Sequence, residues 1–126
     1  EKIKVYFVVD TLEYLQKGGR IGKASAFLGN LLNIKPMLSI QDGLVVPVEK
    51  IRGKARVIEK LIEKVKKDEK EGPLKGVIVH ADAEELAVSY VEKIRGECNF
   101  SELSISTIGA VIGTYTGPGA IGIIYY

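Results

Sequence analysis

The spacing of apolar residues changes from segment to segment along this chain, and it predicts alternating strands and helices. Residues 5–9 and 77–81 are continuous runs rich in β-branched side chains, which are typical of buried strands. In residues 103–107 larger side chains alternate with serines, which predicts a half-exposed strand. Residues 120–126 form the last apolar run, and we expect a final strand there.

Apolar residues at helical spacing indicate two amphipathic helices. In the first, Val57, Leu61 and Val65 share a face, and the helix runs to about residue 71, before a Gly-Pro pair. In the second, Tyr90 and Ile94 belong to a similar apolar face. Capping boxes at residues 10–13 and 82–85 predict how a short helix and this second helix begin.

A further helix is predicted over residues 24–32, where five apolar residues fall at helical spacing. Gly29 interrupts this segment and costs about 1 kcal/mol of helix stability relative to alanine. The shared face either belongs to the core or contacts a ligand. Its members are Ala24, Phe27, Leu28, Leu31 and Leu32.

Residues 36–41 and 44–48 flank Asp42-Gly43, a pair that suits a two-residue type I′ turn, so a β-hairpin is expected. Pro47 cannot donate a ladder hydrogen bond. We therefore expect the second strand to lie at a sheet edge or to end early.

The predicted elements mix hairpin and crossover connections. This order predicts an α+β fold, a two-layer domain with helices packed on a mixed, mainly antiparallel sheet. The length of 126 residues suits a single domain spanning 1–126. The chain opens without an initiator methionine and enters an apolar run almost at once, and we expect further protein on its N-terminal side.

Charge and cysteine content exclude several classes of function. The formal net charge of +2 gives no strong electrostatic case for nucleic acid. Because Cys98 and His80 are the only residues of their types, a metal centre and a Ser-His triad are not expected. The cysteine usage suits a reducing, cytoplasmic compartment. No apolar run reaches transmembrane length, so no stable membrane insertion is expected.

Residues 108–119 contain four glycines, one proline and three hydroxyl-bearing side chains. Such a loop offers bare N–H groups and hydroxyls to an anionic or polar head group. The alternative is a tight turn at residues 117–119 into the last strand. Two motif matches carry no weight. Residues 117–122 fit a dinucleotide fingerprint but no helix follows, and residues 19–23 lack the phosphate-loop spacing.

Two segments resemble the signature of the DegV family. Residues 12–24 followed by 32–36 match its first part, and residues 112–120 match its second. The hairpin and the Lys-x-Arg segment at 50–52 lie between them in the same order. The resemblance covers essentially the whole chain but only the C-terminal half of a DegV protein, so the family's N-terminal α/β domain is absent.

The resemblance implies a binding protein that is not itself an enzyme and needs no cofactor. DegV proteins bind one long-chain fatty acid, with the carboxylate near the domain junction and the acyl chain buried. In bacteria with a fatty acid kinase they present the acid for phosphorylation to acyl-phosphate, for phospholipid synthesis. The expected partners are therefore a fatty acid, a fatty acid kinase and the missing N-terminal domain.

The resemblance also suggests site residues. Tyr115 stands where the family has a histidine that binds the carboxylate, and a phenol donates a hydrogen bond without carrying positive charge near neutral pH. Arg20 and Arg52 match arginines that dock the kinase or handle the phosphate. The expected contacts with the fatty acid head group or chain are Thr114, Tyr115, Thr116, Gly117, Gly119, Ala24, Phe27, Leu28 and Leu31.

The residues alone leave two other functions open. Glycine-rich segments permit a small-molecule kinase-associated or phosphate-binding domain, although His80 is the sole candidate base and no phosphate loop is present. Residues 50–56 carry four positive charges, which suits a solvated surface or a nucleic-acid contact, yet no aromatic residue is interleaved for base stacking.

Overall fold

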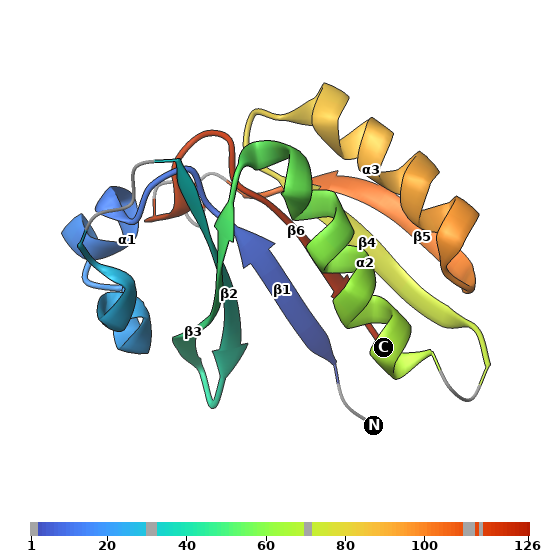
Figure 1. The fold of residues 1–126 in the computed structure, drawn as a ribbon, viewed down its shortest axis with the longest axis horizontal. Coiled ribbons are helices and arrows are strands. Elements are labelled where there is room, and N and C mark those ends of the chain that lie inside the picture. Colours follow the sequence, from blue (N-terminus) through green and yellow to red (C-terminus); the bar gives the residue numbers. More distant parts are fainter. Residues whose placement is uncertain (1–2, 30–32, 70–71, 110–112, 114) are drawn as a thin grey trace.

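The computed structural model describes residues 3–29, 33–69, 72–109, 113 and 115–126, which form a six-stranded sheet with helices packed on it. The strands are β1 (Lys4–Val8), β2 (Ile34–Gln41), β3 (Leu44–Arg52), β4 (Leu74–His80), β5 (Phe100–Thr107) and β6 (Ile121–Tyr125). The helices are α1 (Glu13–Lys17), α2 (Val57–Asp68) and α3 (Glu84–Glu97), with short 3₁₀ helices η1 (Gly22–Phe27) and η2 (Lys54–Arg56). Figure 1 shows α2 and α3 across one face of the sheet and α1 at its end.

The strand order β3-β2-β1-β6-β4-β5 brings both ends of the chain to the centre of the sheet. There β1 and β6 pair antiparallel, with Val5 opposite Ile124. Of the strand pairs formed by the described residues, only β4 and β5 run parallel, and α3 connects them. The predicted α+β fold with a mixed, mainly antiparallel sheet is therefore confirmed.

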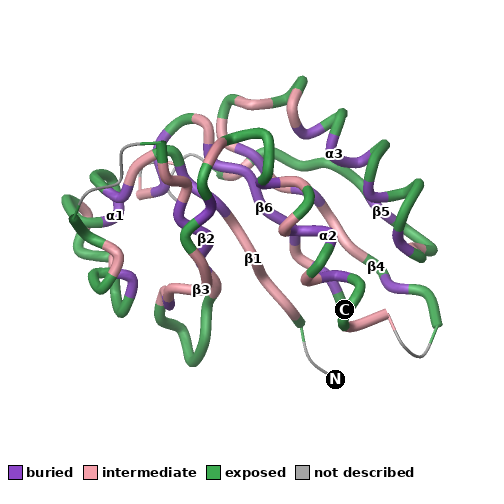
Figure 2. Tube along the Cα trace, viewed as in Figure 1, coloured by how far each residue is buried: buried purple, intermediate pink, exposed green. Residues whose placement is uncertain are grey.

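The main core lies between the sheet and the pair α2 and α3. Leu61 of α2 and Ile94 of α3 are fully buried, as are Ile78 and Ile123 of the central strands. Figure 2 shows buried residues along β6 and on the sheet-facing sides of both helices. The helical spacing therefore predicted these two apolar faces correctly, although α2 ends at Asp68, before the expected position.

The hairpin between β2 and β3 forms as predicted. Asp42 and Gly43 have φ values of 53° and 78°, the left-handed conformations that a type I′ turn requires. Pro47 lies on β3, which is an edge strand, and pairs with Leu38 next to a register shift in the ladder. The expected edge position of the proline strand is thus confirmed.

The helix predicted over residues 24–32 is wrong in its described part. Residues Gly22–Phe27 form a 3₁₀ helix, and Leu28 is already extended, with ψ of 147°. Gly29 has φ of 136°, which a right-handed helix cannot adopt. The chain therefore leaves the helix before Leu31 and Leu32, which lie outside the described residues.

Both predicted capping boxes are also wrong. Helix α1 begins at Glu13, whose N–H donates to Thr11 Oγ1 at 3.1 Å, and no side chain caps its Leu12 N-cap. Helix α3 has Ala83 as its N-cap, and the Ala83 N–H donates to His80 Nδ1 at 3.0 Å. Each helix begins later than the box requires, so the aspartate of the box does not occupy the N-cap.

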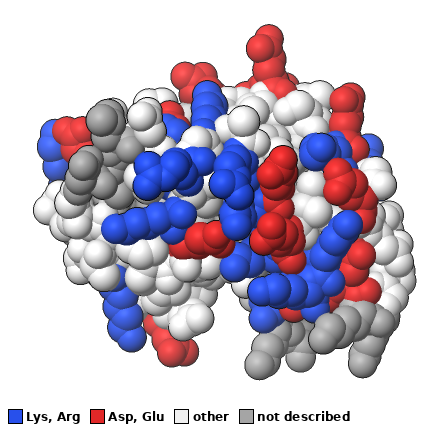
Figure 3. All heavy atoms as spheres, viewed as in Figure 1, with Lys and Arg blue, Asp and Glu red and all other residues white. Residues whose placement is uncertain are grey.

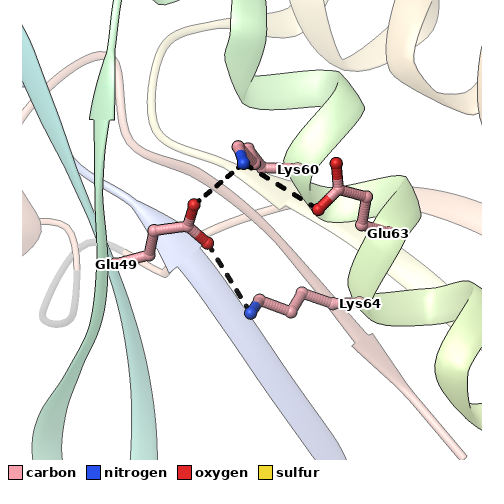
Figure 4. A network of polar contacts seen from close by, with 4 residues as sticks. All are labelled: Glu49, Lys60, Glu63 and Lys64. Atoms are coloured by element: carbon pink, nitrogen blue, oxygen red, sulfur yellow. Dashed lines mark ion pairs between the residues drawn. The ribbon is translucent and has the colours of Figure 1, made fainter.

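Glu49 links the edge strand β3 to α2 (Figure 4). Its carboxylate lies 3.1 Å from Lys60 Nζ and 3.6 Å from Lys64 Nζ. Lys60 also lies 3.9 Å from Glu63. Partial burial acts to raise the pKa of the Glu49 carboxyl, but the two lysines together outweigh burial and hold this pKa below its ordinary value.

Candidate functional site

The face of the sheet opposite α2 and α3, called here the open face, is apolar and incompletely covered. Tyr6 and Val8 of β1 pack under the helices, so the alternation of a strand directs Val5 and Phe7 to the open face. Figure 2 shows most of this central strand as only partly buried. The open face comprises Val5, Phe7, Ile40, Val45, Val79 and Ile124.

Helices α1 and η1 cover one end of the open face and form a second, smaller core. Leu12 just before α1, Leu15 of α1 and Ala24 of η1 are almost completely buried there, together with Val9 and Leu38. This second core fixes the end of α1 beside the loop that leads into β6. It leaves the rest of the open face without a helix among the described residues.

A cavity of about 510 Å³, called here the apolar groove, lies on the open face beside the second core. Its size falls in the range of small-molecule binding sites. Apolar residues from the strands supply most of its walls. The lining residues are Val5, Tyr6, Phe7, Leu15, Arg20, Ile40, Val45, Val79, Thr107, Ile108, Gly109, Tyr115, Thr116, Ile123 and Ile124.

Arg20 is the one charged side chain among the described residues of this lining. It forms no ion pair with a described acidic residue. Its guanidinium carbon lies 4.8 Å from the centroid of the Tyr115 ring, and Nη1 donates to the Gly18 carbonyl at 3.3 Å. The groove therefore offers an unpaired cation beside apolar walls.

Thr116 is also part of the lining of the groove. The residue is 7% exposed, and its Oγ1 is buried without a hydrogen-bond partner among the described residues. An unsatisfied buried polar group costs about 1–3 kcal/mol. Because this oxygen is buried, the hydroxyl does not face the groove as the structure stands, and Arg20 alone favours a ligand with an anionic, oxygen-bearing group.

The glycine loop packs tightly against α1 and its following turn. The Tyr115 ring occupies the space that a side chain at Gly18 would need, and the Tyr14 ring does the same at Gly117. The Asp10 carboxyl likewise fills the space next to Gly119. These glycines therefore allow close packing that sets Tyr115 at the groove.

The structure brings some of the predicted site residues together and separates others. Tyr115, Thr116 and Arg20 share the groove. Gly117 and Gly119 support the loop from outside this lining. Ala24, Phe27 and Leu28 do not line the groove. Ala24 is buried in the second core, Phe27 packs against that core, and Leu28 is 40% exposed. Thr114 and Leu31 lie outside the described residues.

Arg52 lies away from the groove, at the end of β3. It is exposed, as are Lys50, Lys54 and Arg56 of the same basic run. Figure 3 shows basic side chains gathered over the region of β3 and the start of α2, with acidic side chains beside them. The run is therefore a surface feature and contributes no wall to the groove.

Sequence reasoning missed the strand residues that line the groove. It assigned the ligand's chain to helix faces, whereas Val5, Val79 and Ile124 on the open face form the walls. A signal was present, because residues 5–9 and 121–125 are apolar on both sides of the strand. Such continuous runs indicate strands with two apolar faces, and only one of these faces meets α2 and α3.

The remaining chemistry of the described residues is sparse. His80 is buried and accepts a hydrogen bond through Nδ1, which suits a structural role. Burial raises the pKa of the Cys98 thiol to about 11, so it stays protonated near neutral pH. Among the described residues, no group of His, Cys, Asp or Glu could hold a metal ion. No described helix has the length and apolar character to span a bilayer.

Known proteins are similar to this chain in sequence and in fold. Protein DegV of Bacillus subtilis is 40% identical over 98% of this chain, and a fatty acid-binding protein of Thermotoga maritima is 42% identical over 94%. The chain spans only 44% and 42% of those relatives' lengths. A solved structure described as the fatty acid binding of a DegV family protein from Thermus thermophilus matches with a TM-score of 0.92 at 31% identity, covering 99% of this chain and 45% of that one.

The match to the family itself extends over the whole sequence. The model of the DegV family of uncharacterised proteins covers residues 1–126. The sequence segments, the sheet and the family match point to the same conclusion, and the chain belongs to the DegV family.

Proposed function

We propose that this chain is part of a fatty-acid-binding protein and that the apolar groove holds the acyl chain. The observation that carries the proposal is the groove's combination of apolar walls with one cation, Arg20, that pairs with no carboxylate in the described part of the chain. This combination suits a ligand with a long apolar tail and a single anionic head. The fatty acid binding named for the Thermotoga maritima and Thermus thermophilus relatives supports it.

The two parts of the ligand would contribute differently to binding. Each buried methylene contributes about 0.8 kcal/mol, so the strand residues of the open face would supply most of the affinity. A charge-assisted hydrogen bond from Arg20 to the carboxylate would add about 1.5–3 kcal/mol and fix the orientation.

The open face requires a cover, and we assign this role to the family's N-terminal domain in the full-length protein. Val5 and Ile124 are central in the sheet yet only partly buried. This chain spans only 44% of the length of Protein DegV, so that relative extends well beyond the matched region. A domain placed over the open face would enclose the groove and bury the acyl chain on both sides.

The full-length protein would then act as a cytoplasmic carrier without catalytic residues of its own. A separate fatty acid kinase would phosphorylate the presented acid. The exposed basic residues Lys50, Arg52 and Lys54 offer a docking surface for an acidic region of that kinase. Arg20 is also exposed, and so its guanidinium is accessible to a partner as well as to the head group.

A phosphate-binding domain fits the groove less well. In the groove, Arg20 shares the lining with Val5, Ile40 and Ile124. These apolar walls would meet the polar part of a nucleotide or sugar phosphate. Burying such polar groups without partners is unfavourable by several kcal/mol, on the order of 2–7 per group. A fatty acid presents no such conflict.

Lipid extraction from the purified full-length protein tests the proposal. Denaturation followed by mass spectrometry should release a long-chain fatty acid in near-equimolar amount. Delipidated protein should then rebind added oleic acid. Absence of lipid in the extract together with no uptake of oleic acid would refute the carrier role.

A further inference from the structure

We infer that Tyr115 acts through its aromatic ring, as the positioning residue that holds Arg20 for the head group, and that its hydroxyl is not a head-group ligand. The inference rests on the proposed function, because the anion that Arg20 would meet there is a carboxylate. It assigns Tyr115 a role different from the direct hydrogen-bond donor expected from the sequence.

The ring of Tyr115 lies against both Arg20 and Gly18 and is called here the platform of Arg20. The Arg20 guanidinium carbon lies 4.8 Å from the ring centroid, within the distance of about 6 Å over which a cation is attracted to an aromatic face. Gly18 packs against the same ring, so closely that a Cβ would overlap it. Arg20 Nη1 in turn donates to the Gly18 carbonyl at 3.3 Å. Three residues thus restrain one another.

Arg20 needs such restraint because little else holds it. It is exposed, it follows Gly19 in a left-handed turn with φ of 71°, and no described carboxylate pairs with it. A free arginine side chain samples many rotamers, and ordering it upon binding reduces affinity. A guanidinium already held over the ring avoids much of this loss, since an arginine plane stacks well on an aromatic face.

The ring and the hydroxyl make different predictions about selectivity. A positioned cation strengthens binding of a carboxylate and has little effect on a neutral head group. The apolar walls of the groove, formed by the strands, bind the chain of either ligand. The preference for oleic acid over oleyl alcohol therefore reports on Arg20 and its platform, while the affinity for oleyl alcohol reports on the groove.

The test compares dissociation constants of oleic acid and oleyl alcohol for the delipidated full-length protein and its variants. Tyr115→Phe keeps the ring and should retain the preference for the acid. Tyr115→Leu should reduce this preference about threefold to fivefold, the effect of an exposed cation–π contact. Arg20→Gln should reduce it about tenfold or more. Lys23→Gln, a nearby exposed cation outside the groove lining, serves as the control and should change nothing.

Side-chain NMR gives a readout that does not depend on any ligand. In the wild type and Tyr115→Phe, the Arg20 Nε–H proton should show an upfield ring-current shift, which Tyr115→Leu should lose. Equal loss of the shift or of the preference in Tyr115→Phe and Tyr115→Leu would overturn the inference in favour of the hydroxyl. An unshifted Arg20 proton in the wild type would overturn it as well. If the shift is present but neither lipid binds, the proposed function fails while the Arg20–Tyr115 pairing stands and its head-group role is refuted.

Discussion

The aromatic ring of Tyr14 occupies the space in which a side chain at Gly117 would lie. This contact joins α1 to the glycine loop, two segments from opposite ends of the chain. The loop composition alone permits either a plain turn or a ligand-binding collar. The structure shows that Gly117 is needed for packing, because its φ of 84° and the nearby ring both exclude a side chain.

We predict that Gly117→Ala destabilises the protein more than Gly43→Ala does. Both glycines have positive φ, 84° and 78°, so alanine pays a similar backbone strain of about 1–2 kcal/mol at each. Only residue 117 must also displace a ring, since nothing lies within 4 Å of a Cβ at 43. Overpacking adds about 1–3 kcal/mol. Urea unfolding of both variants measures the difference in stability. In a Tyr14→Ala background, where the ring is gone, Gly117→Ala should cost less unfolding free energy than it does in the wild type. Equal losses in the two single variants would contradict the packing role.

The hydroxyl of Tyr125 ties β6 to the end of α2. This fully buried residue donates to Asp68 Oδ2 at 2.7 Å. Tyr125→Phe should therefore lower the free energy of unfolding by about 1–2 kcal/mol. Tyr126→Phe, at a 50% exposed neighbour, should change it by less than about 0.5 kcal/mol. Thermal denaturation distinguishes these results, and similar stability for both variants would show that the hydrogen bond contributes nothing.

The stability difference between the wild type and Tyr125→Phe should also depend on pH in the alkaline range. Burial, followed by the Asp68 carboxylate, raises the pKa of the Tyr125 phenol above its ordinary value. The folded state therefore holds its proton after an unfolded tyrosine loses one, so the stability due to this group is present below pH about 10 and declines above it. The advantage of wild type over Tyr125→Phe should shrink as pH rises past about 10. An unchanged difference at high pH would argue against the shift.

Glu49 should stabilise the fold with a pH dependence opposite to that of Tyr125, so that its contribution is lost at low pH. Its folded pKa is depressed by Lys60 and Lys64, despite partial burial. Such a carboxyl stabilises above its unfolded pKa of about 4.3, and the contribution is lost as pH falls through the lower folded value. Glu49→Gln should cost about 0.5–1 kcal/mol near pH 7, and little at pH about 2. Glu63→Gln, whose contact with Lys60 is 3.9 Å, should cost less near pH 7. Urea titrations across this range that show a pH-independent loss for Glu49→Gln would exclude an electrostatic cause.

The parts of the fold that sequence predicted depend on local patterns. Leu61 and Ile94 lie on helical stripes that require no knowledge of distant residues. Asp42-Gly43 encodes its own turn, because few pairs tolerate two left-handed residues in succession. The helix beyond Ala24 was wrong because apolar spacing does not reveal where a glycine adopts a non-helical conformation, as Gly29 does here.

The candidate site was less predictable because it is assembled from distant segments. Tyr115 and Arg20 were each singled out by motif, yet no pattern indicated that the guanidinium lies over the ring. The groove walls were assigned to helices, since helical stripes stand out more clearly than the second face of a buried strand. Val5 and Ile124 become adjacent only when β1 pairs with β6. Strand pairing of this kind is the long-range information that a single sequence lacks.

A charge on the open face should weaken lipid binding without unfolding the protein. Ile124 lines the groove and is only partly buried, so aspartate there remains tolerable in the folded chain. We expect Ile124→Asp in the full-length protein to weaken oleic acid binding at least tenfold, because the carboxylate would lie against the acyl chain and must keep its own hydration. Isothermal titration measures the affinity, and circular dichroism checks the fold.

Ile105→Asp is the matched control for this prediction. Ile105 sits on β5 opposite Ile78, on the helix-covered side of the sheet, is 36% exposed and does not line the groove. The Ile105→Asp variant should bind oleic acid as the wild type does. Equal loss of binding in both folded variants would mean that charge anywhere on the sheet disturbs the ligand indirectly. Wild-type affinity in folded Ile124→Asp would place the acyl chain away from the open face, because a carboxylate cannot share the groove with a hydrocarbon tail at no cost in affinity.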